Sequence, residues 1–382
     1  MNNCHLPESK APMTTDIERA VQLYNEAALS EEKGNFERAE MLYMESRRIF
    51  EHEGGRHRPD AANILNAIAF MKQKYEDHTG ALAAAREALK VLGPARYAEA
   101  GGDESEIRLQ SWSMVGNTCR HLARYEEAEK SLQKALTYAA SVFGEESEQA
   151  AAARNHLGIL YKYTGKFEQG EKLYRNALKS LMAKHGEMHS SVAVIYHNLG
   201  GLFHARGDFE TGEPYARKAW EINRQLLGED HPITLADAAA YAGVLDGLER
   251  YDESEPIYVR ALEAFEKMYG PEHYEIVVNL NNLANVRYAR GDYDEAERLF
   301  QRALEIKEKI LGLDHPDTAL TANNLGVLLQ SLGCNDEARK LFKRALQVFT
   351  TQLGEDHPHV KMARENLAAT PSANSLTPLP LG

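Results

Sequence analysis

A glycine-led turn returns along this chain at a fixed interval, and this repetition constrains the fold more than any other feature of the sequence. Several copies read Gly-x-Asp-His-Pro, and successive copies from Gly144 to Gly354 are 42 residues apart. An earlier copy at Gly102 keeps this register, whereas Gly55 stands 47 residues before it. One structural unit is therefore repeated along the chain, and one copy carries an insertion. The regular turns begin at Gly144, Gly186, Gly228, Gly270, Gly312 and Gly354.

A second, independent pattern keeps the same interval. An aromatic residue is followed by a small residue, a bulky apolar residue and an alanine, as in Tyr293, Ala296, Phe300 and Ala303. Two patterns that share one register over most of the chain indicate a repeat architecture rather than a set of unrelated domains. The second pattern begins at Phe36, His78, Tyr125, Phe167, Phe209, Tyr251, Tyr293 and, in a degenerate copy, at Asn335.

The spacing of apolar residues within one unit predicts two helices, which we call helix A and helix B. In the seventh copy, apolar residues from Ala296 to Ile310 recur at steps of three and four, which places them on one face of helix B. A shorter apolar stripe from Val277 to Ala284 marks helix A, and Gly291 lies in the turn between the two. The stripe of helix B consists of Ala296, Leu299, Phe300, Ala303, Ile306 and Ile310.

The Asp-His-Pro turn is suited to start the next helix A. Pro232, Pro316 and Pro358 each follow a histidine, and proline is tolerated in the first turn of a helix because its missing amide hydrogen is not needed there. No stretch alternates apolar and polar residues as a strand would. We therefore predict an all-α fold: a right-handed superhelical solenoid of about eight helix pairs, closed by a capping helix over about 358–369. The turns from helix A to helix B are expected near residues 35, 77, 124, 166, 208, 250, 292 and 334.

The repeats are expected to fill residues 16–369, with flexible segments at 1–15 and 370–382. The extra residues of the long interval are expected in a loop within 93–106. This stretch contains a proline and several glycines, which loop out more easily than they lengthen a packed helix.

The residues around the turns resemble the tetratricopeptide repeat. A Leu-Gly pair precedes the turn, as at Leu157-Gly158 and Leu325-Gly326, and the aromatic, small, bulky and alanine positions follow it. The length of 42 residues, with Leu-Gly-x-Asp-His-Pro and Asn-Asn-Leu, is similar to the repeats of kinesin light chains and their bacterial relatives. Kinesin light chains carry a long coiled coil before their repeats, and only a short polar stretch stands there in this sequence. The resemblance therefore implies a shared binding module without the connection to a motor.

Charge and cysteine content restrict the partners and the compartment. The formal net charge is −13, which repels nucleic acid and anionic membrane surfaces alike. The three cysteines are scattered, which fits a reducing compartment, and neither a signal peptide nor a membrane-spanning run is visible. We expect a cytoplasmic protein with protein or peptide partners, no nucleic acid and no membrane.

Residues that resemble chemical motifs are better explained by the repeat. The recurring histidines are expected to form turns, because one residue per repeat cannot converge on a metal ion. Cys119 and Cys334 are interpreted as small buried residues, and Lys307 as part of a solvated face with its charged neighbours. No phosphate loop, zinc motif or nucleophile motif occurs. We therefore expect no enzyme, catalytic residue, metal site or cofactor. The five histidines are His189, His231, His273, His315 and His357.

Asparagine recurs on helix A next to the Leu-Gly pair, where an amide could hydrogen-bond the backbone of an extended peptide. The same residues could instead bridge neighbouring helices. In kinesin light chains the matching asparagines contact cargo peptides, and the resemblance implies that role here. Side chains nearby would add selectivity, although the acidic net charge argues against a preference for acidic peptides. The candidate groove residues are Asn155, His197, Asn198, Asn281, Asn282, Asn323 and Asn324, with Arg120, Lys162, His204 and Tyr288 for selectivity; His156 and Asn366 occupy equivalent positions.

These features predict an interaction scaffold that binds an extended peptide or partner protein in a concave groove lined by helix A of each repeat. One alternative is a peptide-responsive regulator that acts through a change in solenoid curvature. Another is a self-assembling structural repeat protein, although the polar residues of the last helix do not indicate a homo-oligomer.

Overall fold

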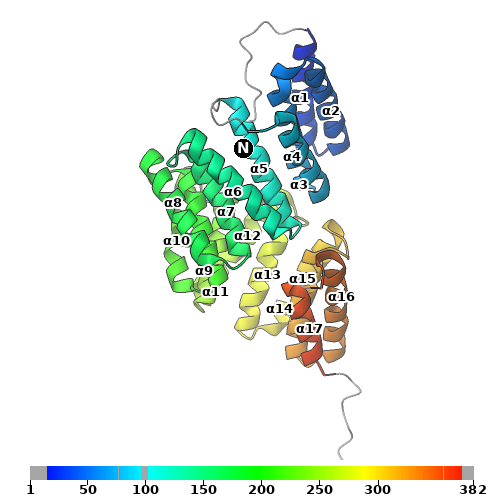
Figure 1. Ribbon diagram of the computed structural model, residues 1–382. Coiled ribbons are helices and arrows are strands. Elements are labelled where there is room, and N and C mark those ends of the chain that lie inside the picture. The colour runs from blue at the N-terminus through cyan, green and yellow to red at the C-terminus, as the bar shows by residue number, and fades with distance from the viewer. Residues whose placement is uncertain (1–14, 76, 96–101, 356, 372–382) are drawn as a thin grey trace, which may run out of the picture. The chain divides into compact units, whose positions relative to one another are not determined.

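The computed structural model describes residues 15–75, 77–95, 102–355 and 357–371, and all regular structure within these ranges is helical (Figure 1). The chain divides into two compact units, Met1–Glu187 and Met188–Gly382. The first unit contains α1 (Thr15–Glu32), α2 (Phe36–His52), a short 3-10 helix (Gly55–His57), α3 (Arg58–Lys74), α4 (His78–Leu92), α5 (Asp103–His121), α6 (Tyr125–Phe143), α7 (Glu148–Tyr163) and α8 (Phe167–His185). The second contains α9 (Ser190–Arg206), α10 (Phe209–Leu227), α11 (Pro232–Gly247), α12 (Tyr251–Tyr269), α13 (Tyr274–Ala289), α14 (Tyr293–Ile310), α15 (Pro316–Ser331), α16 (Asn335–Leu353) and α17 (Pro358–Ala369).

Odd-numbered helices up to α15 are helix A of each repeat, and even-numbered helices are helix B. The predicted turns all fall between an odd-numbered helix and its following partner, and α17 covers the residues predicted for the capping helix. The prediction of an all-α solenoid is confirmed. Among the described helices, none combines the length and the apolar run that a membrane crossing demands.

The turns from helix A to helix B that the structure describes in full, those of every repeat except the second, place one residue in the left-handed region. Gly291 has a φ of +80°, and most other repeats also have glycine there, because glycine has no Cβ that clashes in this conformation. The third and sixth repeats depart from this rule. Ala123 and Glu249 adopt φ values of 56° and 58°, so these two turns carry backbone strain.

The recurring histidines begin the following helix A. Each lies just before the first helical residue, and its Nδ1 accepts a hydrogen bond from the backbone N–H two residues later, at 3.1–3.3 Å. This bond satisfies one of the amides that a helix start leaves without an intrahelical acceptor. The structure therefore confirms the turn-forming role predicted for the histidines. The capping residues are His189, His231, His273, His315 and His357.

The apolar stripe of helix B packs against helix A of its own repeat. In α14, the residues from Ala296 to Ile306 that were predicted to form the stripe are buried, with Phe300 only 2% exposed. Two predictions for this helix were wrong. Ile310 is 39% exposed, because it lies in the last turn of the helix. Lys307 is buried rather than solvated, because its ammonium reaches over to donate a hydrogen bond to the Asp317 carbonyl at 3.1 Å.

The glycine of the Leu-Gly pair lets helix A and helix B approach closely. A Cβ at Gly200 would lie 2.9 Å from the backbone nitrogen of Ala216 in α10. At Gly158 and Gly326 it would meet the rings of Tyr174 and Phe342 at 2.6 and 2.8 Å. Any side chain at these positions would therefore push the two helices apart.

The prediction that Cys119 and Cys334 are buried is correct for one of them. Cys119 in α5 is fully buried, and burial raises the pKa of its thiol to about 11. Cys334 is exposed at the start of α16, so its interpretation as a buried residue was wrong.

Two structural details lie at the predicted boundaries. Helix α5 begins at Asp103, inside the range 93–106 predicted to contain the inserted loop, and the acidic residues of its first turn complement the helix dipole. Residues 96–101 of this range, the segment 1–14 and the tail 372–382 lie outside the described residues. Thr370, predicted to belong to the flexible tail, is buried, and its hydroxyl donates a hydrogen bond to the Asn366 carbonyl at 2.7 Å.

Helices A form the inner side of each unit. In the first unit α3 contacts α5 and α5 contacts α7, and in the second α11 contacts both α9 and α13, while α15 contacts α17. No comparable contact joins successive helices B among the described residues. The closer packing on one side means that each run of repeats curves toward its helices A. We refer to the solvent-facing side of the odd-numbered helices as the A face of each unit.

Candidate peptide-binding surface

The A face of the second unit carries two asparagines whose amides are available to a ligand. Asn282 in α13 and Asn324 in α15 occupy the same position of successive repeats. Both are half-buried, and neither amide has a hydrogen-bond partner among the described residues. Asn285 lies one turn after Asn282 and is exposed, yet the sequence analysis missed it. Its spacing of three residues from Asn282 is the signal that places it on the same helix face.

The neighbouring asparagines already make contacts within the protein. Asn281 donates a hydrogen bond to the Val277 carbonyl of its own helix at 2.9 Å. Asn323 is 1% exposed, and its Oδ1 accepts a hydrogen bond from the Asn366 amide of α17 at 3.1 Å. Adjacent residues on a helix point about 100° apart, so Asn323 is turned toward α17 whereas Asn324 remains half-buried.

In α9, the predicted residue His197 takes part in a network on the side of the helix next to α11. The His197 ring lies 2.7 Å from Asp237 Oδ1, and the Asn223 amide donates to the other carboxylate oxygen at 2.6 Å. Asn198 is buried, whereas the His197 side chain keeps about 41% of its surface exposed. Of these two residues, His197 therefore remains accessible.

Positions predicted to give selectivity form a series with one member per repeat. His204 and Tyr288 belong to it in the second unit; His204 is exposed, and its ring lies 5.3 Å from that of Phe209. Tyr288 is half-buried and packs against Tyr293 with ring centroids 5.6 Å apart. The member of this series in the sixth repeat, Asp246, was not predicted, although it stands 42 residues from both His204 and Tyr288. Burial raises the pKa of its carboxyl, which accepts a hydrogen bond from the Tyr258 hydroxyl at 2.8 Å.

In the first unit, the same series continues with Arg120 in α5 and Lys162 in α7. The Arg120 guanidinium lies 4.6 Å from the ring centroid of Tyr163, and the Lys162 ammonium lies 5.6 Å from it. Asn155, the third predicted residue of this unit, is half-buried in α7. The A face of this unit therefore carries two cations, on α5 and α7, although the chain as a whole is acidic.

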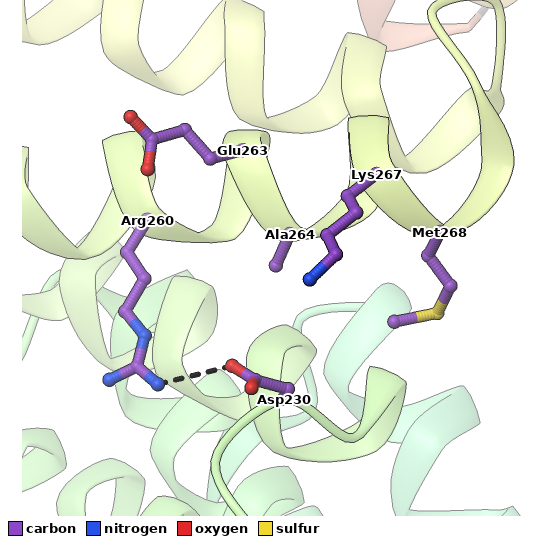
Figure 2. Close-up of a pocket in the computed structure, with 6 residues that line it drawn as sticks. All are labelled: Asp230, Arg260, Glu263, Ala264, Lys267 and Met268. Atoms are coloured by element: carbon purple, nitrogen blue, oxygen red, sulfur yellow. Dashed lines mark hydrogen bonds and ion pairs between the residues drawn. The ribbon is translucent and has the colours of Figure 1, made fainter.

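A pocket of about 480 Å³ lies on helix α12, which is a helix B (Figure 2). Arg260 and Lys267 line it, with Asp230 at the opposite wall, and Arg260 donates to the Asp230 carboxylate at 3.2 Å. The pocket is open, and its charges have mixed sign, so nothing in it selects a particular ligand. The lining residues are Asp230, Arg260, Glu263, Ala264, Lys267 and Met268.

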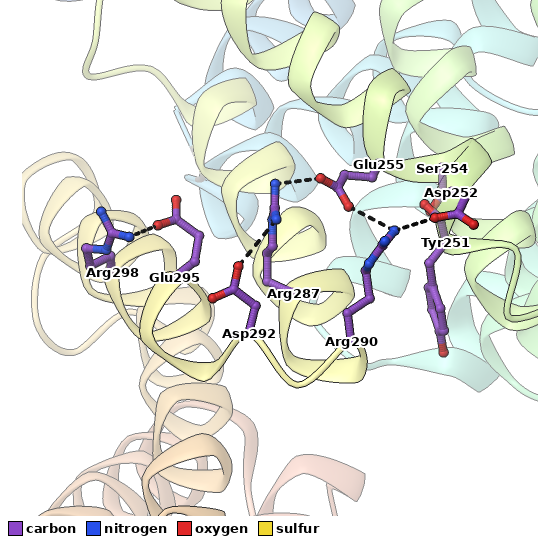
Figure 3. A network of polar contacts seen from close by, with 9 residues as sticks. All are labelled: Tyr251, Asp252, Ser254, Glu255, Arg287, Arg290, Asp292, Glu295 and Arg298. Atoms are coloured by element: carbon purple, nitrogen blue, oxygen red, sulfur yellow. Dashed lines mark hydrogen bonds and ion pairs between the residues drawn. The ribbon is translucent and has the colours of Figure 1, made fainter.

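Arginines of the seventh repeat are paired with carboxylates of the sixth and seventh repeats (Figure 3). Glu255 in α12 contacts both Arg287 and Arg290 at the end of α13, at 2.5 and 3.3 Å. Arg290 also pairs with Asp252 at 2.7 Å, and Arg287 with Asp292 at 3.3 Å. These ion pairs connect neighbouring repeats, so their arginines are occupied within the protein.

Comparison with family models identifies the repeat. The model described as tetratricopeptide repeat matches residues 17–92, 108–183, 191–267, 234–309, 275–333 and 317–371, which together cover most of the chain. The comparison with curated proteins found no match.

Solved structures share the fold at low sequence identity. The crystal structure of a Rap protein complexed with competence and sporulation factor is 15% identical, covers 92% of this chain and 97% of its own, and gives a TM-score of 0.57. BtubC (BKLC) from P. vanneervenii is 23% identical over 63% of this chain and 93% of its own, with a TM-score of 0.47. A putative kinesin light chain from Podosopora anserina with nearly identical repeats is 19% identical over 55% of this chain and 99% of its own, with a TM-score of 0.45.

Proposed function

Because the chain belongs to the tetratricopeptide repeat family, we propose that it is a non-catalytic scaffold that binds an extended peptide, or an extended segment of a partner protein, on the A face of its repeats. Repeat modules of this kind use their inner surface to hold other molecules, and the matching family model is not one of a catalytic family. A structural neighbour, the Rap protein, is itself complexed with competence and sporulation factor, which supports a protein or peptide as the partner class.

The observation that carries this proposal is the pair Asn282 and Asn324. Their amides are half-exposed at equivalent positions of successive repeats, and neither has a partner among the described residues. Helices in direct contact lie about 8–10 Å apart, a span of about three residues of an extended chain, and α13 and α15 are not such a directly packed pair. A peptide running across the A face would therefore meet successive amides three or more residues apart, and each amide can donate to a carbonyl and accept from an N–H. Asn285 would add a further contact on α13.

The scaffold function is distinguished from self-assembly by the character of α17. Lys361, Arg364 and Glu365 are exposed on this last helix, and Arg364 pairs with Glu355 at 2.7 Å. A charged outer face suits a capping helix rather than a surface that stacks on another copy.

The test starts from a random peptide display library selected on the full chain. Asn282→Ala combined with Asn324→Ala should weaken binding of the selected peptide by about 1–3 kcal/mol, or about 5- to 150-fold in Kd. Asn176→Ala is the matched control, because Asn176 is exposed on α8, a helix B. Methylation of single backbone nitrogens in the peptide should weaken binding at a few positions that are three or more residues apart and leave it unchanged at the others. Unchanged binding by the double variant, with the wild-type melting curve retained, would contradict the role of these amides.

A further inference from the structure

Large apolar side chains are exposed in a row along one edge of the second unit, where each helix B ends and the next helix A begins. Three of them occupy the same position near the ends of α10, α12 and α14, 42 residues apart. The other three stand at the starts of α11 and α13 and just before α15. All six side chains are 39–56% exposed. This edge row consists of Leu226, Ile233, Met268, Tyr274, Ile310 and Leu313.

The packing of the repeats does not require this row. The positions equivalent to Met268 are occupied by Lys184 in α8 and by Gln352 in α16, and both of these side chains are exposed. Polar residues are therefore accepted at this position, and the apolar residues are confined to three successive repeats. A concentration of exposed apolar side chains of this kind is typical of an interaction surface.

The charges beside the middle of the row are balanced. Arg260 pairs with Glu229 at 2.6 Å, so its charge is compensated within the protein. Lys267 and Glu263 line the pocket on α12 together with Met268, and neither of the two forms an ion pair among the described residues. Figure 2 shows Lys267 and Met268 on the same side of the helix. A surface with one free charge of each sign favours neither an acidic nor a basic partner, but it is complementary to a copy of itself.

We propose that the edge row is the contact surface for a second copy of this chain, and that the two copies pair about a two-fold axis. An axis through the middle of the row brings Met268 next to its counterpart, whichever way the two rows run. It also brings Lys267 of each copy toward Glu263 of the other, so that both free charges gain a partner. The pair closes on itself, which distinguishes it from the end-to-end stacking of repeats.

The apolar area of the row indicates a weak and reversible dimer. A large apolar side chain has about 60–120 Å² of apolar area, so six that are about half exposed provide about 160–320 Å². An interface at the small end of the known range buries about 600 Å² per partner, of which about 340 Å² is apolar. The two areas are comparable at the upper end of the first range. We therefore expect a dissociation constant of about 10–100 µM.

The first experiment measures the mass of the full chain by sedimentation equilibrium over concentrations from about 1 to 200 µM. A monomer–dimer equilibrium is expected. Met268→Asp should weaken it at least tenfold, because it places two carboxylates next to each other at the axis. Leu332→Asp is the matched control, since Leu332 is 39% exposed at the end of α15, on the edge where helix A is followed by helix B. The melting curve reports whether each variant is folded.

The second experiment keeps the test valid if Met268→Asp does not fold. Lys267→Glu gives a surface with two acids, and Glu263→Lys gives one with two bases. Each variant alone should associate at least tenfold more weakly than wild type, because like charges then meet across the axis. An equimolar mixture of the two variants should associate at least as tightly as wild type, because every pair across the axis is then of opposite sign.

Four results would overturn the proposal: a monomer at 200 µM, a mass that grows beyond the dimer, a dimer that Leu332→Asp weakens as much as Met268→Asp does, or a mixture of the two charge variants that associates no more than its components. The pairing is independent of the proposed peptide binding. Asn282→Ala with Asn324→Ala should leave the dimer unchanged, so failure of either proposal is recognised separately.

Discussion

Replacing Phe300 by alanine probes the packing of the repeats directly. Phe300 is 2% exposed and belongs to one apolar cluster with Leu280 and Ala284 of its own helix A. An aromatic side chain buries about 150–250 Å², which at ~25 cal/mol per Å² corresponds to about 4–6 kcal/mol. The alanine that remains and the compactness of the unfolded chain reduce this to about 3–5 kcal/mol, the range found for such core truncations.

The loss should be local, because each repeat contacts only its neighbours. Urea denaturation followed by circular dichroism should show a first transition at lower urea. Hydrogen exchange should accelerate in α13–α16 while α1–α8 keep their protection. Trp112 in α5 and Trp220 in α10, the two tryptophans of the chain, report the two units separately by fluorescence. Arg298→Ala is the control, because that side chain is 74% exposed. One sharp, unshifted transition in Phe300→Ala would refute the packing described for the seventh repeat.

Three further changes test other parts of the structure. Glu249→Gly should stabilise the protein by about 1 kcal/mol in urea denaturation, because it removes a non-glycine residue from the left-handed region. Gly291→Ala should destabilise the protein for the converse reason. Equal stability of Glu249→Gly and wild type would contradict the backbone strain at Glu249. Gly200→Ala should destabilise by about 1–3 kcal/mol, because its Cβ would lie 2.9 Å from the Ala216 backbone, and an unchanged melting temperature would argue against this close approach. Burial and the positive charges of Arg120 and His78 lower the pKa of His121 to about 4, below its ordinary value of about 6.5. The contribution of His121 to stability should therefore be complete above pH 6.5 and be lost as the pH drops toward 4. His121→Gln should flatten this pH dependence, and an identical pH profile of the variant would contradict it.

The fold could be predicted because most repeats share the same local features. Glycine at the turn, histidine before helix A and an apolar stripe on helix B recur at one interval, so an error in one copy is corrected by the others. The tetratricopeptide repeat resemblance is confirmed on the same grounds. Lys307 and Ile310 were misassigned because helical spacing predicts only the direction in which a side chain points. Whether that side chain is buried depends on which residues of the neighbouring elements lie against it.

The sequence predicted the positions of the candidate site residues but not the directions in which their side chains point. The sequence singled out Asn281 with Asn282 and Asn323 with Asn324, but it could not tell which member of each pair would face solvent, because this depends on the rotation of helix A against its neighbour. Arg120 and Lys162 were expected to act in selectivity. Their shared contact with the ring of Tyr163 required the structure, because Arg120 comes from α5 and Tyr163 from α7.

The most direct test of the account is a crystal structure of the full chain with a peptide selected from the display library. We expect an extended peptide on the A face, with its backbone hydrogen-bonded to the side-chain amides of Asn282 and Asn324. A peptide bound as a helix, or seated on helices B such as the pocket on α12, or held on the A face with both amides more than hydrogen-bond distance from its backbone, would contradict it.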